Sequence, residues 1–254
     1  MVQAVVATKF VTASEASYQA LKTATLLKTL NVNALIMGEI GVGKKCLASF
    51  ILPDASIVDA SNFDDLLTSL ESCNEVIITN IDNSPNIKRL VTALKKSSIR
   101  VIATSKQSFS NEFIDDLFSV KFDIPSLSQR KEDVELLVEL FKAESVALFG
   151  GEQELDLSSF ELDLSQNAKS LKRQVMINYL LQDIQDKELM EIIQSYLDKK
   201  LGSNSDYRKY LYLYEVPLIK AGLSKFKSQL QLADKLGLNR NTLRKKISDN
   251  KQYL

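Results

Sequence analysis

A short apolar run that leads into a glycine-rich loop sets the strongest limit on how this chain can fold. Residues 33–37 are Asn, Ala, Leu, Ile and Met, a pattern typical of a buried strand. Residues 38–45 read Gly-Glu-Ile-Gly-Val-Gly-Lys-Lys and open a helix. In such a loop the backbone N–H groups and the helix N-terminus attract phosphates, and the lysine reaches the outer phosphates. The pattern predicts a site for ATP or ADP made by Gly38, Gly41, Val42, Gly43, Lys44 and Lys45.

Strand and helix patterns alternate after this loop. We expect strands at Ser56–Val58, Glu75–Thr79 and Arg100–Thr104, with helices at Phe63–Leu70 and Pro85–Lys96 between them. Such alternation implies an α/β fold with a parallel sheet and helices on both faces. Phosphate sites in these sheets lie at the carboxyl ends of the strands, which is where the glycine-rich loop falls.

The C-terminal stretch 230–247 has the pattern of two short helices joined by a tight turn. Gly237 permits a left-handed turn, Asn239 can cap the second helix, and Leu243 and Ile247 can hold that helix on a core. The side chains left outward are of the kinds that contact phosphates and base edges. They are Asn239, Arg240, Asn241, Thr242, Arg244, Lys245 and Lys246. We expect a helix-turn-helix that binds double-stranded DNA, the alternative being a solvated basic helix.

Charge is divided unevenly along a chain whose formal net charge is zero. Residues 207–254 hold 11 Lys/Arg and 3 Asp/Glu, whereas residues 1–206 hold 21 Lys/Arg and 29 Asp/Glu. A segment of charge +8 after one of −8 suggests a nucleic-acid-binding tail on an acidic body. With no histidine in the chain, histidine-based catalysis and mixed Cys/His zinc sites are excluded. The sequence contains no membrane-length apolar run and no signal peptide, so we expect a cytoplasmic protein.

The run Leu236–Ile247 resembles the Fis-type C-terminal domain of NtrC-like bacterial enhancer-binding proteins. Residues 10–183 are similar to the AAA+ module of the same family: Ile99–Ser105 resembles the strand ending in its first sensor, and residues 122–134 its passage into a helical lid. Residues 166–171 resemble its second sensor, with Lys169 where the family has an arginine, and Lys169 joins the expected nucleotide site.

The resemblance implies a bacterial protein with a P-loop AAA+ parallel sheet and helical lid, followed by an all-α Fis-type helix-turn-helix domain. The expected boundaries are a core at 1–128, a lid at 129–199, a linker at 200–206 and a DNA-binding, dimerising domain at 207–254. Because residue 1 lies just before the AAA+ module, no N-terminal receiver domain is expected. The pairing surface for a dimer would be Tyr207, Tyr210, Leu211, Tyr212, Leu213, Tyr214, Leu218 and Ile219. Alternatively, this helix packs only on its own domain.

Several residues depart from the family pattern. Between the second and third strands only residues 59–74 remain, with one expected helix and no glycine, so the family's GAFTGA loop is missing. Thr79 and Asn80 stand where the family has an Asp-Glu pair, and Asp82 restores a metal ligand only if the strand end is shifted. No arginine finger lies between Arg100 and Arg130, where Lys106 and Lys121 are the only cations. Lys45 replaces the hydroxyl ligand of magnesium, as a non-hydroxyl residue does in the family itself.

These departures predict no catalytic residue, no metal ligand and no dependable Mg²⁺ site. The leading hypothesis is a DNA-binding transcriptional regulator with a degenerate AAA+ body that binds ATP or ADP without hydrolysis. One alternative is an ATP-driven activator of sigma-54-type polymerase, which would contact RNA polymerase. A second alternative is a subunit that co-assembles with a related full-length AAA+ regulator.

Overall fold

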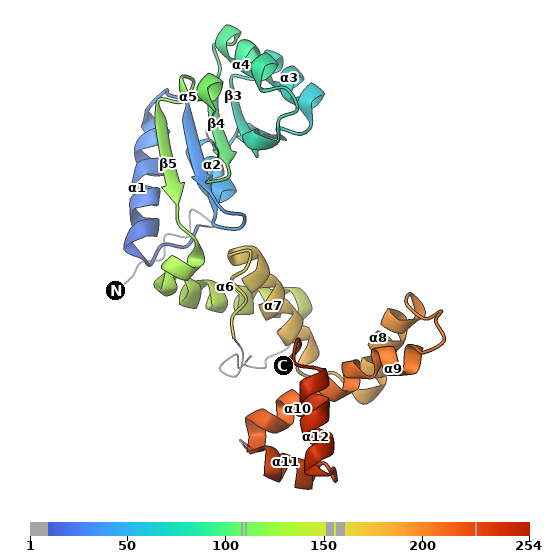
Figure 1. Cartoon of the computed structure of the whole chain (residues 1–254). Coiled ribbons are helices and arrows are strands. Elements are labelled where there is room, and N and C mark those ends of the chain that lie inside the picture. The colour runs from blue at the N-terminus through green and yellow to red at the C-terminus, as the bar shows by residue number, and fades with distance from the viewer. Residues whose placement is uncertain (1–9, 108, 110, 151–154, 156–160, 227) are drawn as a thin grey trace. The chain divides into compact units, whose positions relative to one another are not determined.

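The computed structural model describes residues 10–107, 109, 111–150, 155, 161–226 and 228–254. The chain divides into two compact units, Met1–Asp183 and Ile184–Leu254, which are drawn in Figure 1. Residues 1–9 of the expected core, and residues 151–154 and 156–160 of the expected lid, lie outside the described residues. Among the described helices, none combines the length and apolar composition needed to cross a bilayer.

The first unit contains a five-stranded parallel sheet. Its strands are β1 (Ala34–Gly38), β2 (Ser56–Asp59), β3 (Glu75–Thr79), β4 (Arg100–Ser105) and β5 (Val120–Ile124), in the order β2-β3-β4-β1-β5. Every pairing is parallel; Ile77 of β3, for example, lies opposite Ile102 of β4. The α/β fold with a parallel sheet is therefore confirmed.

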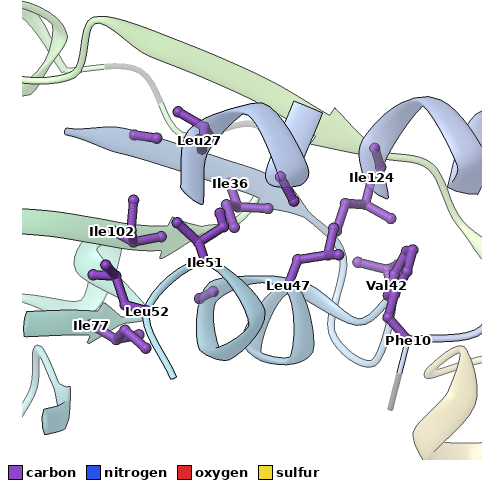
Figure 2. Close-up of a cluster of buried hydrophobic side chains, with 14 residues drawn as sticks. Phe10, Leu27, Ile36, Val42, Leu47, Ile51, Leu52, Ile77, Ile102 and Ile124 are labelled. Carbon is purple, nitrogen blue, oxygen red and sulfur yellow. The ribbon is translucent and has the colours of Figure 1, made fainter. Parts of the chain in front are cut away.

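Helices cover both faces of this sheet because side chains alternate along each central strand. They are α1 (Glu15–Thr29), α2 (Lys44–Ile51), α3 (Phe63–Ser72), η1 (Ile81–Asn83), α4 (Ile87–Lys96) and α5 (Glu112–Asp115); η2 (Leu127–Gln129) follows β5. On one face, Ile36 of β1 packs with Leu47 and Ile51 of α2 and with residues of α1 (Figure 2). On the other face, Leu35 of β1 belongs to a cluster with residues of α3 and α4.

Two helices complete the first unit as a lid-like pair. They are α6 (Lys131–Phe149) and α7 (Ala168–Leu181). Phe141 of α6 and Leu171 and Val175 of α7 are buried together with Leu127 of η2. This small core is separate from the two clusters that flank the sheet, so the helix pair has packing of its own.

The second unit is all-helical. It comprises α8 (Asp186–Asp198), α9 (Asp206–Tyr210), α10 (Tyr212–Phe226), α11 (Gln229–Lys235) and α12 (Arg240–Asp249). Its core joins Ile219 of α10, Leu232 and Ala233 of α11 and Leu243 of α12. Helix α8 groups with this unit, whereas residues 186–199 were expected in the lid. Within the expected linker, Gly202 and Ser203 donate backbone N–H bonds to the carboxylate of Asp206, the first residue of α9, and so tie the linker to the start of that helix.

Candidate functional site

The glycine-rich loop joins the end of β1 to the start of α2 at the carboxyl edge of the sheet. Gly41 has a φ of 81° and Gly43 a φ of 107°, conformations that side-chain-bearing residues rarely adopt. A Cβ on Gly41 would lie 2.1 Å from the carbonyl oxygen of Gln166, and one on Gly43 would lie 2.6 Å from the ring of Phe10. The loop therefore needs glycine at both positions, for conformation and for space.

Lys44 opens α2 and folds its side chain back onto the loop. Its ammonium donates to the backbone carbonyls of Gly38 and Glu39, the second at 2.7 Å. Burial lowers the pKa of Lys44, while the nearby charges of Asp82 and Glu39 oppose that shift. A half-buried ammonium beside a helix N-terminus is suited to holding an anionic group.

Asn167 ties the loop to the lid-like pair. Its side-chain NH₂ donates to Glu39 Oε2 at 3.0 Å and to the Ile40 carbonyl at 2.9 Å. Its side-chain oxygen accepts from the Leu127 N–H at 2.6 Å. The residue is 1% exposed and has a φ of 53°, a conformation that is uncommon outside glycine. One amide side chain thus bridges three segments of the chain.

A buried ion pair also contacts the loop, through the carbonyl of Val42. Arg130, 2% exposed, donates to the Val42 carbonyl at 3.1 Å and pairs with Asp133 at 3.2 Å. Asp133 also accepts from the backbone N–H groups of Ala13 and Ser14 and from the hydroxyls of Ser14 and Ser17. Burial lowers the pKa of Arg130 and the Asp133 charge opposes this; the guanidinium stays charged because arginine does not deprotonate in proteins.

Uncharged residues follow the third strand where it reaches the same edge. Thr79 is the last residue of β3, and Asn80 follows it with a φ of 53°. The Asn80 side-chain NH₂ and the Thr79 hydroxyl both donate to Asp59 Oδ2, at 2.7 Å and 3.2 Å. Partial burial raises the pKa of Asp59, but hydrogen bonds from Ser61, Asn80 and Thr79 outweigh it, so the net shift is downward.

Asp82 lies in η1 and pairs with a lysine that follows β4. The ammonium of Lys106 is 3.2 Å from Asp82 Oδ2, and the Lys106 backbone N–H donates to Oδ1 at 3.3 Å. The Asp82 side chain is 8% exposed, whereas that of Lys106 is 60% exposed. The carboxylate is therefore already neutralised by a protein cation.

A cavity of about 600 Å³ opens between the loop, the end of β4 and the lid-like pair. Its lining residues are Glu39, Ile40, Lys106, Gln107, Ser165, Gln166 and Asn167. Glu39 and Ile40 belong to the glycine-rich loop, so a molecule in the cavity would lie beside the backbone of that loop. Most of the cavity surface is apolar, and its two charged side chains, Glu39 and Lys106, have opposite signs. Pockets of this kind bind ligands through apolar walls and a few placed polar groups.

The predicted nucleotide residues fall into two groups. Gly38, Gly41, Val42, Gly43 and Lys44 form one loop, with Val42 buried beneath it. Lys45 and Lys169 are exposed, and neither lines the cavity. The sequence did not indicate that Asn167 bridges the loop to other segments or that Gln107 lines the cavity. Lys106 stood out in the sequence only as one of two cations between Arg100 and Arg130.

The residues at this edge do not fit a magnesium ion. Magnesium beside a P-loop is held by a hydroxyl after the lysine and by a carboxylate after the third strand. This chain has Lys45, Thr79 and Asn80 at those places, and Asp82 is paired with Lys106. Within the described ranges, no cluster of three or more Asp, Glu, Cys or His side chains could hold a metal.

No family model and no curated protein sequence matches this chain. Among solved structures it is similar to NtrX from Brucella abortus in complex with ATP, at 17% identity and a TM-score of 0.61 over 95% of this chain and 69% of that one. The ADP complex of the same protein matches at 17% identity and a TM-score of 0.61, over 95% of this chain and 68% of that one. A RuvB structure from Thermotoga maritima matches at 13% identity and a TM-score of 0.44 over 92% and 85%.

The first unit has a P-loop α/β fold like that of the matched NtrX structure. The 17% identity to NtrX shows the fold alone. That fold accounts for the position of the glycine-rich loop, at the carboxyl end of β1 and in hydrogen-bond contact with Asn167, the residue before α7.

A second candidate site lies in the all-helical unit. Helices α11 and α12 are joined by a turn in which Gly237 has a φ of 64° and the Leu238 N–H bonds to the Ala233 carbonyl at 2.9 Å. The side chain of Asn239 caps α12 by accepting from the Asn241 N–H at 2.8 Å. Leu243 is fully buried. The two short helices and the tight turn that the sequence predicts are therefore present.

The predicted DNA-contacting residues are not equivalent in the structure. Five are exposed on α12: Arg240, Asn241, Thr242, Arg244 and Lys245. Asn239 is exposed as well, but its side-chain oxygen is occupied by the cap. Lys246 is half-buried and forms an ion pair with Glu215 of α10, so its charge serves the packing of α12 on α10.

The predicted pairing surface, from Tyr207 to Ile219, also contains both exposed and buried side chains. Tyr207 and Tyr214 are 81% and 67% exposed, whereas Ile219 is 1% exposed within the core. Tyr212 stacks on Tyr253, with ring centroids 4.9 Å apart, and the Tyr210 hydroxyl donates to the Lys200 carbonyl at 3.0 Å. A hydrogen bond with Tyr196 raises the pKa of Tyr212. Part of the predicted pairing surface is thus used inside the unit.

Proposed function

We propose that this chain is a DNA-binding transcriptional regulator whose AAA+ module binds ATP or ADP without productive hydrolysis. The observation that carries the proposal is the contrast at one edge of the sheet. The glycine-rich loop lies between β1 and α2 with positive φ at Gly41 and Gly43, which supports phosphate binding, while β3 ends at Thr79 and is followed by Asn80 instead of acids. The groups expected to bind phosphates are therefore retained at the edge of the sheet where the acids needed for hydrolysis are missing.

The missing groups are those on which NTP hydrolysis depends. Asp82 is bound to Lys106, and Asp59 is hydrogen-bonded by Thr79 and Asn80, so neither is placed to activate a water. No arginine occurs between Arg100 and Arg130. An arginine finger alone is worth about three to five orders of magnitude in related enzymes. We infer that turnover is negligible.

The region between β2 and β3 argues against a sigma-54-type activator. Helix α3 (Phe63–Ser72) occupies most of the stretch from Asp59 to Glu75. Leu66 and Leu70 of this helix are buried against the sheet. The whole stretch is described and contains no inserted loop that could reach a polymerase subunit.

The exposed side chains of α12 support DNA as the ligand of the second unit. Arg240, Asn241, Arg244 and Lys245 are spaced i, i+1, i+4 and i+5, which places them on one face of a helix. Buried Leu243 holds the opposite face on the core. A basic helix face with an amide among its cations can combine phosphate contacts with base readout. As in the family it resembles, the chain would act as a dimer through this unit.

Calorimetric titration with ATP and ADP, together with a steady-state hydrolysis assay, tests the nucleotide half of this proposal. We expect both nucleotides to bind, Lys44→Ala to abolish binding, and no turnover above that of Lys44→Ala. Lys22→Ala, which removes an exposed lysine from α1, serves as the matched control and should bind like wild type. Turnover that Lys44→Ala eliminates would contradict the proposal and favour an ATP-driven motor.

Binding to a pool of random duplex DNA tests the other half. Changing Arg240 and Arg244 to Ala together should weaken binding and reduce its salt slope by about two, since each phosphate contact contributes roughly 0.9. The control changes Lys187 and Lys199 to Ala, which removes the same charge from α8 and its C-cap. Selected sequences should show two half-sites about 34 Å apart if a dimer binds. Equal losses in the two double variants would reject α12 as the DNA-reading helix.

A further inference from the structure

Lys106 is the one cation-bearing side chain that lines the cavity of the first unit, within the described part of the chain. It directly follows β4, and its side chain is 60% exposed. Asp82 holds it at 3.2 Å through one carboxylate oxygen. An ammonium has three N–H donors, so a single ion pair leaves others free for a ligand. The lysine is thus anchored and still accessible from the cavity.

Most carboxylate oxygens at this edge of the sheet already accept hydrogen bonds or ion pairs from the protein; of Glu39, which lines the cavity with Lys106, Oε2 accepts from Asn167. Both oxygens of Asp82 are taken by Lys106, one by its backbone N–H and one by its ammonium. Asp59 accepts four hydrogen bonds, two from Ser61 and one each from Thr79 and Asn80. A magnesium ion requires unpaired oxygen ligands at short, near-octahedral distances. It would have to displace these partners to bind here.

Phosphates nevertheless need neutralising charge when they leave water. Lys44 supplies one positive charge at the loop. Lys106 lies close enough for its charge to act on Lys44, and both lie near the charge of Asp82. Lysine is a common phosphate ligand in proteins and acts as a point charge without strict geometry. Two lysine charges therefore lie near Asp82, the carboxylate that follows the third strand.

We propose that Lys106, together with Lys44, neutralises the phosphates of a bound nucleotide in place of Mg²⁺, so that binding does not depend on a divalent metal. This inference rests on the proposed nucleotide site and names the residue that adapts it to the loss of its acidic ligands. Asp82 has a positioning role here, because it orients the lysine and does not coordinate a metal.

Calorimetric titration of the full chain with ATP, in excess Mg²⁺ and in EDTA, tests the inference. We expect the two affinities to agree within about twofold. Lys106→Ala should lower both about tenfold, as expected for the loss of one charge-assisted hydrogen bond. The control Lys95→Ala removes an exposed lysine from the last turn of α4 and should leave both affinities unchanged.

A second variant separates the two possible roles of Asp82. Asp82→Asn keeps an oxygen that can accept from the Lys106 N–H and removes a negative charge beside the phosphates. Retained or higher affinity for ATP supports the inference, whereas an affinity that falls only in the presence of Mg²⁺ marks Asp82 as a metal ligand and overturns it. Binding that requires Mg²⁺ in wild type also overturns the inference but leaves the proposed function standing. Absence of binding in both buffers would instead overturn the nucleotide half of the proposed function.

Discussion

At the scale of single residues, the first unit depends on a few polar side chains that bridge distant parts of the chain. Asn167 reaches Glu39 and Ile40, and Arg130 reaches Val42, across spans of 88 to 128 residues. Each is almost fully buried, so each unmade hydrogen bond would cost more than an exposed one. These residues connect the glycine-rich loop to the segments before α6 and α7.

Asn167→Ala should destabilise the first unit by about 1–3 kcal/mol, because it leaves the buried Leu127 N–H without a partner. Asn167→Gly removes the same hydrogen bonds, but glycine tolerates a φ of 53°. It should therefore cost less than alanine. Urea unfolding followed by circular dichroism gives both values. If both variants unfold at the wild-type midpoint, Asn167 has no role in holding the loop and the lid-like pair together.

The carboxyl group of Asp206 makes the stability of the second unit depend on pH. A hydrogen bond from the Ser203 hydroxyl, with bonds from the Gly202 and Ser203 N–H groups, lowers its pKa from 3.8 to about 2. A depressed carboxyl pKa stabilises the folded state above pH 3.8 and loses that contribution as pH falls toward 2. An NMR titration of the Asp206 carboxyl carbon measures the value. Ser203→Ala should raise this pKa and Ser195→Ala should not; a wild-type midpoint near 3.8 would contradict the assigned hydrogen bonds.

At the scale of elements, the position of α12 depends on how closely α10 and α11 cross. Gly222 of α10 is buried, and a Cβ there would lie 2.2 Å from a methyl of Leu232, which is itself fully buried in α11. Glycine inside a helix costs roughly 0.5–1 kcal/mol relative to alanine. The close crossing is the structural feature that offsets this cost, since it lets Leu232 contact Leu243 of α12 in one core.

Gly222→Ala should therefore destabilise the second unit by about 1 kcal/mol, since overpacking of a core exceeds the gain in helix propensity. In a Leu232→Ala background the clash disappears, and the same substitution should become stabilising. Thermal unfolding of the four proteins in this double-mutant cycle gives the coupling energy. Additive effects would show that the two helices do not cross at Gly222.

At the scale of the whole molecule, positive charge and two highly exposed tyrosines occur in the same part of the chain. The basic segment 207–254 carries +8 and also the exposed Tyr207 and Tyr214. Exposed tyrosines with large apolar area are common anchors of protein interfaces. We infer that the second unit brings two copies together, as a palindromic DNA site would require.

Changing Tyr207 and Tyr214 to Ser together should weaken self-association, because two large anchors are lost while the buried Ile219 is untouched. Sedimentation velocity over a concentration series measures the dimer constant. Tyr18→Ser, at a tyrosine of α1 that is 57% exposed, is the control. A wild-type chain that stays monomeric at every concentration, or a variant that dimerises equally well, would reject this surface.

The sequence by itself determined the elements whose patterns are local. The run from residue 33 to residue 50 specified β1, the glycine-rich loop and α2, and Gly237 with Asn239 specified the turn before α12. Two local patterns were missed. One is α1, which follows the capping residue Ser14. The other is β5, where Val120, Phe122 and Ile124 alternate with Lys121 and Asp123. This strand is short and pairs only with β1, so little of it is buried.

Only the tertiary structure decided which side chains complete the candidate site. The pairing of Lys106 with Asp82, the bridging of the loop by Asn167 and the grouping of α8 with the second unit join residues that no periodicity relates. It also separated Lys246, paired with Glu215, from the exposed cations of α12. A local pattern indicates which side of its own segment is buried. A contact between distant segments depends instead on how those segments pack, and no single stretch of sequence determines that packing.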